Sequence, residues 1–316
     1  MISILVRLFG VLLLLTALAL PLMQAPDRAV ETLVGRWAPP PSELVDMQGQ
    51  LVHYRDEGPR ADAQPIVLLH GTSASLHTWE GWTKVLRSQR RVISLDLPGF
   101  GLTGPFAGHY AGQAYDGAHY ARFVLDLLDK LGVQQFVVAG NSLGGQVAWT
   151  LAQTAPQRVS KLILVDALAY PVSADGLPLG WRLARLPVLG HLTEHLLPRP
   201  LVLQALRTVY AEPHRINEAL LDRYYELTLR TGNRAALVDR LQHWSPTEGV
   251  AHVTGITQPT LILWGQQDQL IPLSHGQRLA ADIPGSQLVV LPDMGHVPHE
   301  EDPARSLVPV KAFLGL

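Results

Sequence analysis

A series of short apolar runs, each ended by glycine, proline, asparagine or aspartate, constrains the fold of this chain more than any other feature. The runs that follow Pro41 read QLVHYRDEG, PIVLLHG, RVISLDLPG, QFVVAGN, KLILVDA, PTLILWG and SQLVVLP. The first alternates apolar and polar residues, as a half-buried strand does. The others are rich in leucine and β-branched residues, which is typical of parallel strands buried on both faces.

Helical spacing appears between these runs. Residues 118–132 (AHYARFVLDLLDKLG) repeat apolar side chains on one side of a helix and end at Gly132. Strands that alternate with helices predict an α/β fold, with a mostly parallel sheet and helices on both of its faces. Ligands of such sheets bind beyond the carboxyl ends of the strands, so the residues just after each strand are the candidates for function.

The run QFVVA is followed by GNSLGG, which places Ser142 in a Gly-x-Ser-x-Gly pattern. The helical sequence LGGQVAWTLAQTA follows directly, so the serine is predicted to sit on a tight turn between a strand and a helix. Gly140 and Gly144 are needed there, because side chains at these positions would collide where the strand and the helix cross. Ser142 is therefore the candidate nucleophile.

A serine hydroxyl needs a base to take its proton and a third group to orient that base. Asp268 follows the strand TLILWG, and His296 follows the strand QLVVLP. The order Ser, Asp, His along the chain, with each residue at the end of a strand, is similar to the order of the catalytic residues in α/β-hydrolases. We therefore expect His296 to be the general base and Asp268 to orient it.

Other residues compete for these roles. Asp166 ends the strand LILV and is the alternative partner of His296. His299 is expected at the surface or at a helix cap, and His70 is expected to fix the turn that follows its strand. The charged residues in QLVHYRDEG and those after His296 are expected to face solvent.

Attack on a carbonyl group creates an oxyanion, which preorganised hydrogen-bond donors must stabilise. The N–H of Leu143, the residue after the nucleophile, is one expected donor. The turn HGTSAS supplies the second, for which Thr72 is the first choice and Gly71 or Ser73 the alternatives.

These motifs carry a family resemblance. The stretches LLHGTSASLHTWEGW, DLPGFGLT, GNSLGGQVAW, LWGQQDQLIP and DMGHVPHEEDP resemble the α/β-hydrolase superfamily, in its esterase and C–C bond hydrolase branch. The resemblance covers about residues 48–170 and 256–316. Dehalogenases and epoxide hydrolases of that superfamily carry aspartate where this chain has Ser142. Meta-cleavage-product hydrolases typically have tryptophan after the catalytic histidine, where this chain has Val297.

Residues 170–255 lie between the matching blocks and read as helices interrupted by prolines. One helix is expected to open at Pro213, and Asn233 is expected to cap the next. The resemblance implies that this segment is a helical cap over the pocket. The predicted organisation is thus residues 1–25 as an N-terminal segment, 26–169 as the first part of the core, 170–255 as the cap and 256–316 as the second part of the core.

The N-terminal segment has one charge, Arg7, before an apolar run from Leu8 to Met23. A stretch of this length is long enough to cross a bilayer of about 30 Å. We favour an uncleaved membrane anchor over a cleaved signal peptide, because the small residues in the run give poor cleavage sites. The charge distribution then places the catalytic body on the periplasmic or extracellular side.

Composition narrows the function. A net charge of −2 gives no basic footprint for nucleic acid, and the absence of cysteine rules out thiol catalysis and disulfides. The histidines lack metal-site spacing with carboxylates, and no phosphate-binding loop or cofactor motif is present. We expect a carboxylesterase for small-molecule esters of modest apolar size, with a pocket that excludes charged groups.

Two alternatives stay open. The first is a C–C bond hydrolase of diketo acids, which would need a cation for the substrate carboxylate; the cap offers Arg182, Arg185, Arg199, Arg207 and Arg230. The second is a non-catalytic binding module with the same fold.

Overall fold

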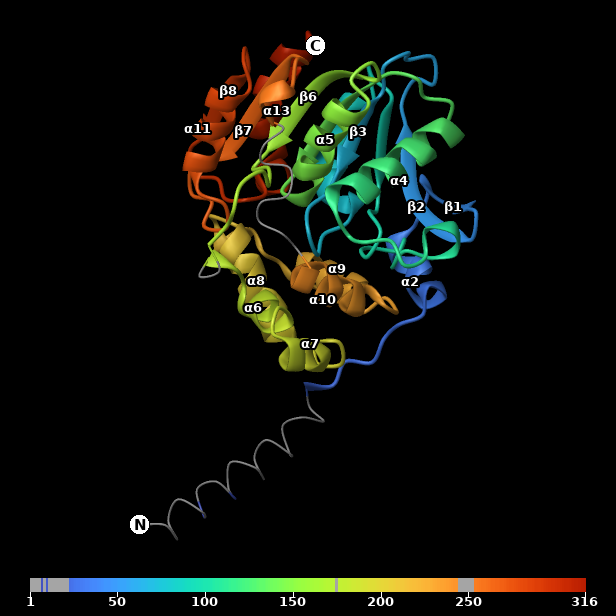
Figure 1. Cartoon of the computed structure of the whole chain (residues 1–316), viewed down its shortest axis with the longest axis vertical. Helices are drawn as coiled ribbons and strands as arrows, with labels where there is room; N and C mark the ends of the chain where they lie inside the picture. The colour runs from blue at the N-terminus through green and yellow to red at the C-terminus, as the bar shows by residue number, and fades with distance from the viewer. Residues whose placement is uncertain (1–6, 8–9, 11–22, 174–175, 244–252) are drawn as a thin grey trace.

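A central sheet organises the protein, as the computed structural model shows for residues 7, 10, 23–173, 176–243 and 253–316 (Figure 1). The sheet has eight strands in the order β1-β2-β4-β3-β5-β6-β7-β8. The strands are β1 (Ser42–Met47), β2 (Gln50–Glu57), β3 (Ile66–Leu69), β4 (Val92–Leu95), β5 (Phe136–Asn141), β6 (Val159–Val165), β7 (Thr260–Gly265) and β8 (Gln287–Leu291). Strand β2 pairs antiparallel with β1 and β4, and the remaining pairs are parallel. The predicted α/β fold is confirmed.

Strand β1 was not predicted. It lies at the edge of the sheet, and only its last residue, Met47, is buried. An edge strand that faces solvent has no need of the continuous apolar run that marks the buried strands. The sequence SELVDM therefore carries little of the signal that identified the others.

Helices cover both faces of the sheet because successive side chains of a strand point to opposite sides. Val67 and Leu69 of β3 pack in the core beneath α4, α5 and α11, whereas Ile66 and Leu68 pack beneath α3 and α13. The helices around the sheet are α2 (Val30–Trp37), α3 (Glu80–Leu86), α4 (Gly117–Lys130), α5 (Leu143–Thr154), α11 (Leu273–Asp282), α12 (Pro298–Glu301) and α13 (Pro303–Leu314). Short 3-10 helices span Leu76–Trp79, Gly108–Tyr110, Pro213–Arg215 and Val253–Gly255.

Between β6 and β7 the described chain is helical. These helices gather at one end of the sheet (Figure 1). They are α6 (Leu179–Ala184), α7 (Pro187–Thr193), α8 (Arg199–Val209), α9 (Glu218–Thr228) and α10 (Asn233–His243). We call residues 179–243 the helical segment.

Two expectations for helix starts in this segment need correction: the position of one start was wrong, and the other, α10, begins at Asn233 as expected but without the expected cap. Helix α9 does not open at Pro213, which starts a short 3-10 helix; it opens after Asn217, whose side chain accepts a hydrogen bond from the N–H of Leu220 at 2.8 Å. Asparagine is a strong N-cap, and it overrides the proline signal here. The side chain of Asn233 does not cap α10 but donates to the carbonyls of Gly101 and Leu227.

Most of the predicted N-terminal anchor, residues 1–25, lies outside the described residues. Among the residues that the structure does describe, no helix is long and apolar enough to span a membrane. The following helix, α2, contacts α9 of the helical segment. Arg36 of α2 forms ion pairs with Asp222 and Glu226 of α9.

Candidate active site

Ser142 occupies the turn between β5 and α5. Its backbone has φ 54° and ψ −116°, a conformation that is costly for a residue with a side chain. A Cβ atom on Gly140 would lie 2.0 Å from the carbonyl oxygen of Gly144, and one on Gly144 would lie 2.1 Å from that of Leu69. The close crossing predicted from the sequence is therefore present, and both glycines are required by it.

His296 and Asp268 are in contact. The ring Nδ1 of His296 lies 2.7 Å from Oδ2 of Asp268, and both residues are buried. The other oxygen of Asp268 accepts hydrogen bonds from the N–H groups of Leu270 and Ile271, at 2.8 and 2.9 Å. A carboxylate with these donors holds the Nδ1–H tautomer of His296, which leaves Nε2 to accept a proton.

The backbone of His296 is held by groups that the sequence reading had not assigned. Its N–H donates to the carbonyl of Val209 at 2.8 Å, and its carbonyl accepts from Nδ2 of Asn141 at 2.9 Å. The preceding N–H, of Gly295, donates to Glu301 at 2.9 Å. Asn141 directly precedes Ser142, so the serine turn and the histidine loop are joined by a hydrogen bond.

The charged residues expected to face solvent are partly buried. Glu301 is 4% exposed and accepts hydrogen bonds from two backbone N–H groups, those of Gly295 and Glu212. Asp56 in the RDE stretch is 5% exposed and pairs with Arg91 at 2.7 Å. Buried charges are retained where they are paired or hydrogen-bonded. Glu212 and Arg91 are distant in the sequence from the carboxylates that they bind, whereas Gly295 lies six residues from Glu301.

Asp166 lies beside the pair formed by Asp268 and His296. One ring nitrogen or carboxylate oxygen from each of the three residues lies within 4.8 Å of the others. It is Asp268, however, that accepts the hydrogen bond from Nδ1 of His296. Asp166 is fully buried and accepts a hydrogen bond from the N–H of Gly265 at 2.8 Å. Burial, together with the charge of Asp268, raises the pKa of Asp166 well above its ordinary value. Both effects favour the protonated form of Asp166.

The other two histidines considered from the sequence, His70 and His299, are both buried. His70 contacts the carbonyl of Gly71 through Nδ1 at 2.7 Å and accepts from the N–H of Leu97 through Nε2 at 2.9 Å. It fixes the turn as expected, and burial lowers its pKa. His299 was expected at the surface, which is wrong: it is fully buried, and its ring lies 4.0 Å from that of Trp79.

The two residues expected to supply the oxyanion donors are both close to Ser142. Thr72 lines the same cavity as Ser142, and a Cβ atom on Gly71 would come within 3.1 Å of the Ser142 Cβ. Leu143 is the first residue of α5, where backbone N–H groups have no partner within the helix. Among the described residues, the N–H groups of Thr72 and Leu143 have no acceptor.

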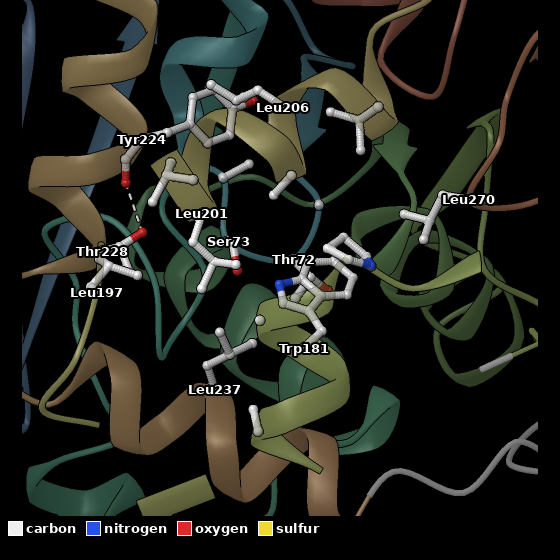
Figure 2. A pocket seen from close by; sticks show the side chains of 18 of the residues that line it. Thr72, Ser73, Trp181, Leu197, Leu201, Leu206, Tyr224, Thr228, Leu237 and Leu270 are labelled. Carbon is white, nitrogen blue, oxygen red and sulfur yellow. Dashed lines mark hydrogen bonds between the residues drawn. The ribbon is translucent and has the colours of Figure 1, made fainter. Parts of the chain in front are cut away.

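Ser142 and His296 line one cavity, with a volume of about 130 Å³, beneath the helical segment. Figure 2 shows apolar side chains converging on it from α6, α8 and α10, with Tyr224 and Thr228 of α9 joined by a hydrogen bond of 2.7 Å. The labelled lining residues are Thr72, Ser73, Trp181, Leu197, Leu201, Leu206, Tyr224, Thr228, Leu237 and Leu270.

None of the five arginines considered from the sequence lines this cavity in the described part of the chain; Arg234 does. The helical spacing could have found it. Arg234 lies three, four and seven residues before Leu237, Val238 and Leu241, on one face of α10. A cation on an apolar face is a signal that was overlooked.

A mostly parallel sheet with a strained serine at one strand end, and a histidine–carboxylate pair at the ends of two others, defines the class of hydrolases with an α/β architecture. The chain belongs to the alpha/beta hydrolase fold family, because the sequence model of that family matches residues 64–303. The resemblance inferred from the motifs is thus confirmed, and the protein is a hydrolase of this fold.

Several relatives are similar over most of the chain. An uncharacterised protein of Mycobacterium tuberculosis is 30% identical, with 88% of this chain and 82% of the relative covered. A 2-hydroxy-6-oxononadienedioate/2-hydroxy-6-oxononatrienedioate hydrolase of Cupriavidus pinatubonensis is 26% identical, with 78% and 84% covered.

Solved structures show the same fold. A thermophilic esterase from Thermogutta terrifontis superposes with a TM-score of 0.72 at 24% identity, covering 86% of this chain and 98% of that one. A bacterial membrane phospholipase A also gives a TM-score of 0.72 at 24% identity, covering 99% and 96%.

Proposed function

We propose that this hydrolase is a serine carboxylesterase that cleaves esters of short to medium chain through an acyl-enzyme on Ser142. The observation that carries the proposal is the placement of Ser142 and His296 on one apolar cavity, with His296 bound to Asp268 at 2.7 Å. In the proposed mechanism, Nε2 of His296 takes the proton of the Ser142 hydroxyl as its oxygen attacks the ester carbonyl.

The negative charge that develops on the carbonyl oxygen is assigned to the N–H groups of Leu143 and Thr72. Leu143 directly follows Ser142, Thr72 lines the same cavity, and neither N–H has an acceptor among the described residues, so both are free to bind an oxyanion. His296 then returns the proton to the departing alcohol. In the second half of the cycle, His296 takes a proton from a water molecule, whose oxygen attacks the acyl carbon. The bond to Ser142 breaks, His296 gives the proton to the serine oxygen, and the acid is released. Asp268 keeps the histidine ring in the tautomer that this cycle needs.

The size of the cavity supports small substrates. An apolar cavity of about 150 Å³ holds a molecule the size of benzene. The cavity here has a volume of about 130 Å³, so it suits an acyl group of a few carbons. Its lining is apolar apart from a few groups, which favours an acyl chain over a peptide or sugar.

C–C bond cleavage is the second candidate, because relatives include a hydrolase of an oxo-dienedioate. Steady-state turnover of p-nitrophenyl butyrate beside a meta-cleavage dienoate separates the two. We expect the butyrate ester to have the higher kcat/KM, and a clear preference for the dienoate would overturn the esterase assignment.

Labelling with a fluorophosphonate separates both reactions from a non-catalytic binding role. Native protein is expected to label, and the Ser142→Ala and heat-denatured proteins are not. Native protein that fails to label would contradict catalysis at Ser142.

We also propose that the apolar run from Leu8 to Met23 anchors the protein in a membrane, with the catalytic body on the periplasmic or extracellular side. The proposal rests on the length of the run and on Arg7 before it. Protease treatment of intact spheroplasts tests it: the body is expected to be digested, and full protection would reverse the orientation.

A further inference from the structure

Helix α7 and the residue before it expose apolar side chains at the end of the molecule away from the sheet (Figure 1). Four large apolar side chains lie within residues 186–192 and are between 38% and 78% exposed: Leu186, Val188, Leu189 and Leu192. We call these four residues the α7 face. Apolar residues that are exposed singly are common, but a group of them marks a surface that binds a partner.

The opposite side of α7 packs against the protein. Gly190 is buried, and a Cβ atom there would lie 2.7 Å from the carbonyl oxygen of Ala184 and 3.2 Å from Cγ1 of Val238. This close approach holds α7 on α6 and α10, and a rotation of the helix would put larger side chains where a glycine now fits. A partner for the α7 face therefore has to come from outside the described part of the chain.

The N-terminal apolar run ends at Met23, beside the α7 face. The carbonyl of Met23 accepts a hydrogen bond from the N–H of Leu197 at 3.2 Å. The N–H of Ala25 donates to the carbonyl of His195 at 3.1 Å, three residues after Leu192. The end of the run is thus fixed to the stretch of chain that carries the α7 face, so a bilayer that the run enters lies at this end of the molecule.

The charges around the α7 face favour a lipid partner. No aspartate or glutamate occurs between residues 176 and 193, although the whole chain has a net charge of −2. Arg182 of α6 is exposed, and Arg185 lies between α6 and α7. An apolar face bordered by cations is typical of helices that lie in the surface of a membrane with anionic lipids. A second copy of this chain would bring the same cations together, which is unfavourable.

We propose that the α7 face docks on the surface of the lipid bilayer that holds the N-terminal run. The proposal rests on the membrane anchor proposed above and goes beyond it, because it assigns a second membrane contact to the folded part of the protein. Apolar helix faces of this kind enter a bilayer by about 5–10 Å, to the boundary between headgroups and acyl chains. Removal of the four side chains from water favours this placement.

Docking places one wall of the active-site cavity at the bilayer. Thr193, Leu196 and Leu197 follow the α7 face in the chain and line the cavity that contains Ser142. The cavity wall, the α7 face and the end of the apolar run therefore belong to one stretch of structure. Apolar esters leave water for a bilayer, so the docked protein holds this wall where such substrates are concentrated.

The absence of cysteine allows a single position to be labelled at a time. Val188→Cys and Val308→Cys are made in the full-length protein, labelled with an environment-sensitive fluorophore and reconstituted into vesicles of phosphatidylcholine and phosphatidylglycerol in equal parts. Val308 of α13 is the matched control, because it is also a helical valine, with 68% exposed against 78% for Val188. Helix α13 lies toward the opposite end of the molecule (Figure 1).

We expect the label at position 188 to emit at shorter wavelength in vesicles than in detergent-free buffer. Lipids that carry a nitroxide should quench it, and a nitroxide near the headgroup should quench more than one at the end of the acyl chain, because docking is shallow. The label at position 308 should show neither change.

A charge placed in the α7 face separates docking from mere proximity to the anchor. Leu192→Glu in the labelled Val188→Cys protein should lower the quenching at position 188 several-fold, because a carboxylate is costly to bury among acyl chains. Leu192→Met keeps an apolar side chain and should retain the quenching. Leu186→Glu, at a second exposed position, serves if thermal unfolding shows that Leu192→Glu is not folded.

Three results would overturn the proposal. The first is a label at position 188 that nitroxide lipids quench no more than the label at position 308. The second is a shift to shorter wavelength without such quenching, which would mean that a protein surface, either a second copy or the N-terminal run, covers the α7 face. The third is unchanged quenching in Leu192→Glu, which would mean that the anchor alone brings the label to the bilayer. Protein that does not float with the vesicles would contradict the anchor as well as the docking.

Discussion

The carboxyl edge of the sheet and the helical segment (residues 179–243) meet the same cavity but are built differently. At the sheet edge, polar groups are fixed individually: Asp268 accepts hydrogen bonds from His296 and from two backbone N–H groups. The helical segment contributes mainly apolar surface from short helices, and Val188 of α7 is 78% exposed.

Under the proposed function, this difference separates chemistry from selection. The proposed proton transfer depends on hydrogen-bond geometry at the sheet edge, so an atom changed there should alter rates by orders of magnitude. The proposed selection of the acyl chain depends on aliphatic contacts in the helical segment, and a methylene in an apolar pocket changes discrimination by only about 10- to 200-fold. Arg234 is the exception to the apolar character of that segment, because it is a buried charged residue that lines the cavity.

The largest contrast should appear between two carboxyl groups of the sheet edge. Asp268→Asn removes the charge that holds the tautomer of His296, and kcat for p-nitrophenyl butyrate should fall by about 10³- to 10⁴-fold. Burial and the charge of Asp268 raise the pKa of Asp166, which favours its protonated form, and Asp166→Asn substitutes an amide of similar shape for that form. We expect its kcat to stay within a few-fold of wild type.

Both variants should unfold at temperatures close to that of wild type, which is the control for these rates. If Asp166→Asn were the more damaging change, the carboxylate that supports His296 would have been assigned to the wrong residue.

A substitution in the helical segment should have a smaller effect, and it should change the preference for chain length rather than the rate of the chemical step. Trp181 of α6 lines the cavity, as Figure 2 shows, and Trp181→Ala should enlarge it. We expect the preference for p-nitrophenyl octanoate over butyrate, as a ratio of kcat/KM, to rise about ten-fold. Val188→Ala, at an exposed position of α7, is the matched control and should leave the ratio unchanged. A loss of kcat on every chain length would show that α6 also supports the chemistry.

The two regions also differed in how far the sequence predicted them. The strands that lead to Ser142 and Asp268 were legible because they are buried parallel strands with long apolar runs. Strand β8, which leads to His296, was legible from the same kind of run, although it lies at the edge of the sheet and only Leu291 of it is buried. The pairing of Asp268 with His296 followed from chain order, and the sequence motif predicted the glycine crossing at Gly140. These features depend on local sequence.

Most of the features that the sequence did not reveal depend on contacts between residues that are far apart in the sequence. Glu301 and Asp56 read as surface charges, because the N–H of Glu212 and the side chain of Arg91, which bind them, lie far away in the sequence. Arg234 is a different case, because its spacing from Leu237 and Leu241 on α10 was visible in the sequence and was overlooked. The start of α9 was misplaced because two local signals, Pro213 and Asn217, competed.

The smallest expected effect concerns His299, which lies behind the active-site edge and takes no part in the proposed chemistry. Its ring packs against Trp79 and Trp82, and neither ring nitrogen has a hydrogen-bond partner among the described residues. Burial lowers the pKa of His299 well below its usual value, so the native protein keeps this ring neutral. His299→Phe replaces it with a ring of similar shape that has no polar atoms to satisfy.

The sign of the pH dependence follows from proton binding. As pH falls below about 6.5, the unfolded chain gains a proton on His299 that the native protein does not accept, so acid destabilises the wild type at this site. His299→Phe removes that contribution. The variant should therefore be more stable than wild type by about 1–3 kcal/mol, with the larger gain at pH 5 and the smaller at pH 8, as measured by urea unfolding. A variant destabilised equally at both pH values would mean that the ring nitrogens of His299 are hydrogen-bonded in the native protein, and that this part of the core tolerates its polar atoms as well as the sheet edge does.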